Sequence, residues 1–193
     1  MGMYASLHKI SPAQLDRVRA SPSLTERLLD PDDEEFGGDW WPEGPILELD
    51  KAWHVIHFLL TGDEWGGSAP LKDAIVGGTE IGPDLGTGPA RFLTAEEVRA
   101  VSAALGRTSE SDLRSRFDPA ALDAAQIYPG MWKPAAPPKR GLFGRAKAVA
   151  PDKSVETKEL AEFLDFAMER FRALVTFYTA AAGNGDAMLL VIG

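Results

Sequence analysis

The order of apolar and polar residues along the chain predicts short strands and helices, framed by one strand at each end. Met3, Ala5 and Leu7 alternate with the residues between them over 2–9, which is the period-two pattern of a strand. Ser11-Pro12-Ala13-Gln14 predicts a helix start, because it combines a serine cap, a proline at the first helical position and a glutamine three residues after the cap. The wholly apolar segment 187–192 predicts the last strand.

Two predicted helices differ in how much apolar surface they carry. Residues 51–60 have almost no polar face, so we expect a central helix that Asp50 caps and Thr61-Gly62 stops. The segment 154–182 carries one apolar stripe at helical spacing, which predicts a long helix with Phe163, Phe171 and Leu174 in the core. Shorter helices are predicted at 22–29, at 70–76, after the capping box Thr94-Ala95-Glu96-Glu97, and from Ser109 and Asp118.

The remaining segments predict irregular structure. The acidic stretch that runs to Asp50 is expected to be a loop, and residues 79–89 are expected to hold at most one short strand. Residues 134–151 contain four prolines and no acidic residue, which predicts an exposed, flexible basic insertion. The chain therefore predicts an α+β fold: a mostly helical single domain over residues 1–193, with a small sheet that includes both terminal strands and a long C-terminal helix.

Charge and composition narrow the function classes. The 193 residues hold 20 Lys and Arg against 29 Asp and Glu, a net charge of −9, which disfavours nucleic acid and anionic membrane as partners. The absence of cysteine excludes disulfides and thiolate chemistry. The sequence shows no signal peptide and no apolar run long enough to span a bilayer, so we expect a cytoplasmic protein.

His54 and His57 are the sharpest polar feature, because imidazoles three residues apart share one side of a helix. Two interpretations stand. The pair can be an acid–base or ligand-binding site, with Asp50, Asp63 or Glu64 at the helix ends completing it. Alternatively, both rings are buried and bonded to the backbone or a carboxylate. A third metal ligand is not evident, so no metal is expected.

Other motifs give weaker signals. Trp40 and Trp41 lie together in the acidic loop, where they either fold onto the core or form a binding anchor. The glycines around Gly82 do not match a phosphate loop, the acidic run 30–35 lacks the spacing of a calcium loop, and no serine lies in a nucleophile elbow. No cofactor is therefore expected.

Several blocks of the sequence resemble one known family. They are Met1-Gly2-Met3, the segment 50–62, the segment 88–94, Arg116-Phe117-Asp118-Pro119, Ile127-Tyr128-Pro129 and the apolar C-terminal strand. In this order they resemble the YfbM-like family of bacterial domains of unknown function. The resemblance implies a compact α+β domain and implies no activity.

Two functional hypotheses follow. The first is a non-enzymatic interaction protein whose acidic surface binds a basic protein partner, for example in an immunity-type role against a secreted toxin. The second is a small hydrolase-like or metal-assisted enzyme that uses His54 and His57, with catalysis excluded if both imidazoles are sealed in the core. The sequence does not specify an oligomeric state.

Overall fold

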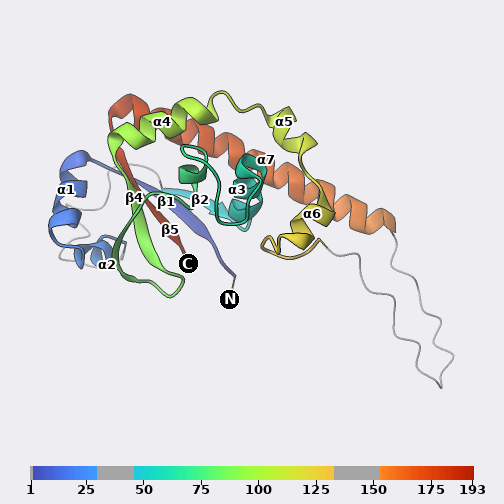
Figure 1. The fold of residues 1–193 in the computed structure, drawn as a ribbon, viewed down its shortest axis with the longest axis horizontal. Coiled ribbons are helices and arrows are strands. Elements are labelled where there is room, and N and C mark those ends of the chain that lie inside the picture. Colours follow the sequence, from blue (N-terminus) through green and yellow to red (C-terminus); the bar gives the residue numbers. More distant parts are fainter. Residues whose placement is uncertain (1, 30–45, 133–152) are drawn as a thin grey trace, which may run out of the picture.

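The computed structural model describes residues 2–29, 46–132 and 153–193. These residues form an α+β fold of helices packed on a five-stranded antiparallel sheet (Figure 1), which confirms the predicted fold class. The strands are β1 (Ala5–Ile10), β2 (Ile46–Asp50), β3 (Thr79–Asp84), β4 (Pro89–Leu93) and β5 (Ala187–Ile192). The helices are α1 (Pro12–Ala20), α2 (Leu24–Leu29), α3 (Trp53–Thr61), the 3-10 helix η1 (Lys72–Ala74), α4 (Ala95–Leu105), α5 (Glu110–Ser115), α6 (Pro119–Ala124) and α7 (Lys153–Asn184).

The two terminal strands pair with each other at the centre of the sheet. The strand order is β2-β1-β5-β4-β3, and β1 pairs antiparallel with β5 from Ala5 opposite Ile192 to Ile10 opposite Ala187. The chain ends consequently lie side by side (Figure 1), and the amide of Tyr4 donates to the carbonyl of Gly193 at 2.7 Å. This pairing brings both ends of the sequence into one core.

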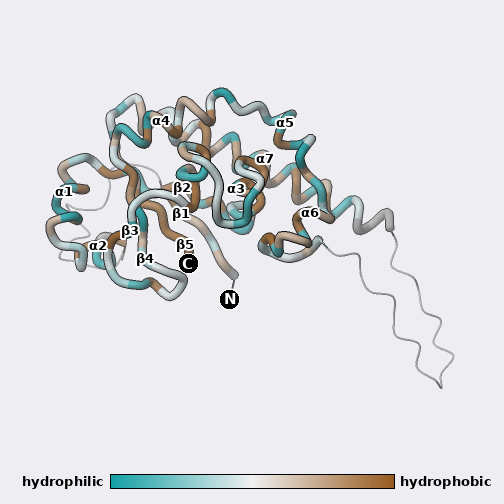
Figure 2. Tube along the Cα trace, in the orientation of Figure 1, coloured by the Kyte–Doolittle hydropathy of each residue, from teal (hydrophilic) through white to brown (hydrophobic). Residues whose placement is uncertain are grey.

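Strand β5 is apolar because helices cover both faces of the sheet. Its residues alternate between a larger core with α3, α4 and α7 and a smaller core with α1. Met188 and Leu190 face the first, and Ala187 and Leu189 face the second. The colouring in Figure 2 shows the same concentration of hydrophobic residues along β5. A central strand buried on both sides is expected to read as a continuous apolar run.

Predicted helix starts with side-chain caps are confirmed. Ser11 and Gln14 form a reciprocal capping box at α1, and Thr94 and Glu97 form another at α4. Ser109 and Asp118 cap α5 and α6. Helix α7 matches the predicted long helix and buries Phe171 and Leu174, whereas Phe163 is only half-buried. In the described ranges, no helix is both long and apolar enough to cross a bilayer.

Two strands were not predicted. Residues 46–50 form the edge strand β2, with Leu47 opposite Leu7 of β1, although the sequence indicated a loop up to Asp50. Residues 89–93 form β4, which pairs with both β3 and β5. Both strands are only five residues long, and β4 starts at a proline. Their existence therefore depends on hydrogen bonds to neighbouring strands more than on local periodicity.

The start of α3 also differs from the prediction. Asp50 ends β2 with φ 51°, and its Oδ1 accepts from the adjacent Lys51 amide at 2.7 Å. The N-cap of α3 is Ala52, which makes no side-chain cap. The predicted helix at 70–76 is reduced to the single 3-10 turn η1.

Candidate functional site

His54 is buried in α3, and both of its ring nitrogens are bonded to the backbone. The exposed fraction of the residue is only 2%. Nδ1 accepts a hydrogen bond from the amide of Tyr128 at 3.0 Å, and Nε2 lies 2.9 Å from the carbonyl oxygen of Glu64. Because an amide only donates and a carbonyl only accepts, the ring must be neutral with its proton on Nε2. Burial lowers the pKa of His54, in agreement with this assignment.

His57 is fully buried without such bonds. The residue is 0% exposed, and neither ring nitrogen has a hydrogen-bond partner of ordinary geometry among the residues that the structure describes. Burial lowers the pKa of His57 to about 4, and the nearby His54 lowers it further in the same direction. Asp63 and the backbone of Gly66 favour the protonated ring but do not overcome burial. The two histidines therefore have different environments on one helix, and both rings are held neutral.

A short loop over residues 62–67, which we call the Trp65 loop, covers the histidines. Gly62 ends α3 in the left-handed conformation, with φ 77° and its amide bonded to Phe58. Asp63 Oδ1 then accepts from the amides of Trp65 and Gly66 at 3.0 and 2.6 Å, and these bonds lower the pKa of the Asp63 carboxyl. At Gly67, with φ 114°, a Cβ atom would lie 2.7 Å from Thr61, so the loop closes only with glycine there.

The loop places the Trp65 side chain on the surface. Trp65 is 49% exposed, yet the inner part of its ring packs on His54, with centroids 4.9 Å apart, and on Trp53 at 5.6 Å. Trp53 in turn stacks on His54, with centroids 4.5 Å apart. Trp65 is thus the outermost member of an aromatic stack that begins in the core.

One shallow pocket, which we call the Glu64 pocket, lies on one side of Trp65. It has a volume of about 360 Å³, and Glu64 is the single acidic residue that lines it. Its other lining residues are Met3, His54, Trp65, Gln126, Tyr128, Pro129 and Gly130. The phenolic oxygens of Tyr4 and Tyr128 both lie beside Gly2, which places Tyr4 next to this pocket. The pocket therefore combines aromatic walls with one carboxylate.

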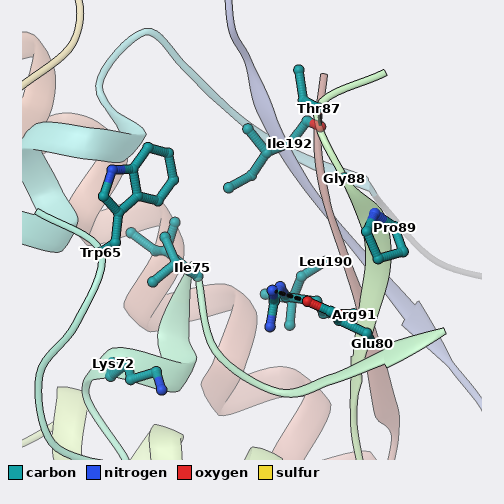
Figure 3. Close-up of a pocket in the computed structure, with 11 residues that line it drawn as sticks. Trp65, Lys72, Ile75, Glu80, Thr87, Gly88, Pro89, Arg91, Leu190 and Ile192 are labelled. Carbon is teal, nitrogen blue, oxygen red and sulfur yellow. Dashed lines mark hydrogen bonds and ion pairs between the residues drawn. The ribbon is translucent and has the colours of Figure 1, made fainter. Parts of the chain in front are cut away.

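A second pocket, the Lys72 pocket, lies on the other side of Trp65 and is drawn in Figure 3. Its volume is about 290 Å³, and it is bounded by Lys72 and Ile75 from η1 and its C-cap, by strands β3, β4 and β5, and by the turn at Thr87 and Gly88. Arg91 of β4 forms an ion pair with Glu80 of β3 at its rim. This pocket therefore carries two cations and one carboxylate over an apolar floor.

The predicted catalytic candidates do not assemble into a site. Among the contacts of the described residues, none joins the Asp50 carboxylate to His54 or His57. Glu64 meets His54 through its backbone carbonyl, and Asp63 is engaged by loop amides. Within the described ranges, no group of three or more His, Asp or Glu side chains is arranged to hold a metal ion. Trp40, Trp41 and the basic segment 134–151 lie outside the described residues.

The sequence reasoning missed the two pockets. Trp65 lies in the polar run Thr61-Gly62-Asp63-Glu64-Trp65-Gly66-Gly67, and a lone tryptophan among glycines and acids is a signal that could have indicated an exposed anchor. No local signal links Lys72 with Arg91, because they are far apart in the sequence and line one pocket only in the folded chain.

Comparison with known proteins agrees with this description of the fold. The family described as "Domain of unknown function (DUF1877)" matches residues 1–191. A crystal structure of YfbM from Escherichia coli, a protein of unknown function, is similar over 100% of both chains, with a TM-score of 0.62 and 20% sequence identity. No curated protein matches the chain. At this identity the likeness to YfbM concerns the fold alone.

Proposed function

The chain belongs to the DUF1877 family, described as a domain of unknown function, and from its own geometry we propose a non-enzymatic interaction protein that binds a basic protein partner. The Glu64 pocket and its rim form the docking surface, and a cationic side chain of the partner enters the pocket. We place this activity in the cytoplasm, as the sequence predicts.

The observation that carries the proposal is the gathering of exposed apolar side chains around the Glu64 pocket. Tyr4, Trp65 and Met131 are exposed at 43%, 49% and 40%, and they are the large hydrophobic residues with the highest exposure in the described ranges. Trp65 lines the pocket, Tyr4 flanks it beside Gly2, and Met131 follows the lining residue Gly130. Exposed aromatic and methionine side chains are typical anchors of protein interfaces.

Charge supports a cationic occupant. Glu64 is the one carboxylate in the lining, and His54 beside it is neutral, so the pocket has negative charge and aromatic walls. Arginine and lysine side chains bind over the faces of tryptophan and tyrosine and pair with carboxylates. The net charge of −9 further favours association with a basic protein through long-range attraction.

The environment of the histidines argues against the alternative enzyme. A general base needs a free lone pair that reaches the substrate, but Nδ1 of His54 already accepts from Tyr128, and both nitrogens of His57 are inaccessible. His54 instead lines the floor of the docking surface. An immunity-type role, in which the partner is a secreted toxin, is one specific form of this proposal.

A pair of peptides matched in shape but different in charge tests the pocket directly. We would titrate the protein with capped Ala-Arg-Ala and with capped Ala-citrulline-Ala, following the indole N–H resonance of Trp65 by NMR. Saturable shifts are expected with the arginine peptide and not with its uncharged counterpart. Glu64→Gln should abolish the difference, whereas Glu159→Gln, which removes an exposed carboxylate on α7, should retain it.

Capture from cells of the source organism extends the test to the natural partner. A basic protein retained by the unmodified chain and by Glu159→Lys, but lost with Glu64→Lys and with Met131→Glu, would support the proposal. Equal retention by all four chains, or citrulline peptide shifts equal to those of the arginine peptide, would contradict it.

A further inference from the structure

We propose that the Lys72 pocket is a binding site for a small organic monocarboxylate with an apolar body. The carboxylate lies between the side chains of Lys72 and Arg91, and the apolar body lies against Trp65, Ile75 and Leu190. This site is separate from the Glu64 pocket and does not depend on the function proposed for that pocket.

The arrangement of the lining residues gives the pocket two unlike ends (Figure 3). Trp65 and Ile75 stand on one wall, while Leu190 and Pro89 close the opposite side. Lys72, from η1, and Arg91, from β4, line the pocket from different sides. A ligand in this pocket therefore meets an apolar surface and a cationic end at once.

Lys72 has no protein counter-ion among the described residues. The residue is half-buried, and within the described part of the chain its ammonium group makes no ion pair and no hydrogen bond. Lysine usually keeps a charged head in water while its stem covers apolar surface. Lys72 lines the cavity, so an anion held there would lie near its ammonium group.

Arg91 supplies the second cation. Its Nη2 donates to Glu80 Oε1, and this ion pair fixes the direction of the guanidinium. Arginine carries five N–H donors in a planar fork, so the other donors stay available for the two oxygens of a carboxylate. Lys72, Arg91 and Glu80 together leave one positive charge, which matches a monoanion.

The size and walls of the pocket specify the rest of the ligand. A volume of about 290 Å³ lies at the lower limit of pockets that hold small molecules, roughly 300–1,000 Å³. The exposed face of Trp65 favours a flat or aromatic body, because stacked rings gain from contact beyond the burial of apolar area. An aromatic acid of the size of phenylacetate meets both conditions.

The experiment compares phenylacetate with uncharged phenylacetamide on the intact protein, by NMR titration of the Trp65 indole. Phenylacetate should bind saturably and phenylacetamide at least about tenfold more weakly, because the amide lacks the charge-assisted bonds. Lys72→Met and Arg91→Gln should each weaken phenylacetate at least about tenfold and leave the amide unchanged. Lys51→Met, which removes an exposed cation elsewhere, serves as the matched control.

Three results would overturn the proposal. Equal binding of the acid and the amide, or unchanged phenylacetate binding in Lys72→Met, would exclude the cationic end as a carboxylate site. Tighter binding of phenyl phosphate than of phenylacetate would indicate that the ligand is a phosphate monoester and not a carboxylate. Thermal unfolding of each variant confirms that the fold persists. Glu64→Gln leaves this pocket intact. If this variant loses arginine-peptide binding and retains phenylacetate binding, the two sites are independent of each other.

Discussion

Polar and ionisable side chains lie on both the inner and the outer side of the Trp65 loop, but they are buried on the inner side and exposed to solvent on the outer side. On the inner side, His54 and His57 are enclosed, neutral and packed against aromatic rings. On the outer side, Glu64, Lys72 and Arg91 line pockets open to solvent. Chemistry-bearing residues on the inner side therefore stabilise the fold, while those on the outer side are available to partners.

The two histidines sharpen this contrast further. His54 satisfies two buried backbone groups, one from the Trp65 loop and one from the loop that begins after α6. His57 satisfies none. The same residue type, one helical turn away, is therefore a cross-link in one case and a buried polar group without a partner in the other. The predictions below follow from this difference.

The largest effect is expected from His54→Leu. This substitution leaves the Tyr128 amide and the Glu64 carbonyl without their buried partner, and each such loss costs roughly 1–3 kcal/mol. The free energy of unfolding should fall by roughly 2–5 kcal/mol, measured by urea denaturation. A loss below ~1 kcal/mol would indicate that the two loops are held together by other contacts.

Acid should destabilise the protein through its buried histidines. Burial lowers the pKa of both His8 and His57 to about 4, below the ordinary value of 6.5. Between these two pH values the two histidines are protonated in the unfolded chain and neutral in the folded chain. The free energy of unfolding is therefore highest above pH ~6.5 and decreases as the pH falls toward ~4. Each ring contributes a loss on the order of 3 kcal/mol.

The measurement is the free energy of unfolding as a function of pH, with His57→Leu as the comparison. Removing His57 should flatten the slope between pH ~6.5 and ~4 by up to about 1.4 kcal/mol per pH unit, the value for one proton. An unchanged slope would mean that His57 titrates at an ordinary pKa in the folded protein.

Trp65→Ala probes the boundary between the two sides of the loop. The substitution removes ring contacts to Trp53 and His54, which are worth ~0.5–1.5 kcal/mol per aromatic pair. A loss of about 1–2 kcal/mol is expected, together with loss of binding in both pockets. The surface changes Glu64→Gln and Lys72→Met should stay within ~0.5 kcal/mol of the unmodified protein. A larger decrease in the free energy of unfolding for either variant would show that the residue stabilises the fold.

His57→Leu should have the smallest effect on stability at neutral pH. Replacing a buried, unpartnered imidazole by an apolar side chain removes its desolvation cost, so the free energy of unfolding should change by less than ~1 kcal/mol, in the stabilising direction. The matched substitution His54→Leu on the same helix is the control. A loss above ~2 kcal/mol would reveal a bond from His57 to its surroundings, with the Gly66 backbone as the first candidate.

The sequence by itself determined the elements whose signals are local. The capping boxes at Ser11 and Thr94 and the apolar stripe of α7 act within one helix, and the structure contains them. The apolar run 187–192 predicted a buried strand without indicating its partners. Such features depend on hydrogen bonds and burial between residues near in sequence, or on composition alone, so they are readable along the chain.

Only the tertiary structure decided which polar residues are accessible. His54 and His57 share one pattern in the sequence, but the Tyr128 amide that fixes His54 lies 74 residues away along the chain, and no hydrogen bond of ordinary geometry joins His57 to the described residues. Likewise, Lys72 and Arg91 line one pocket only because the fold brings η1 and the strand β4, which pairs with β3 and β5, to the same cavity. Hydrogen bonds and charges act over a few ångströms of space, and distance along the chain does not specify that space.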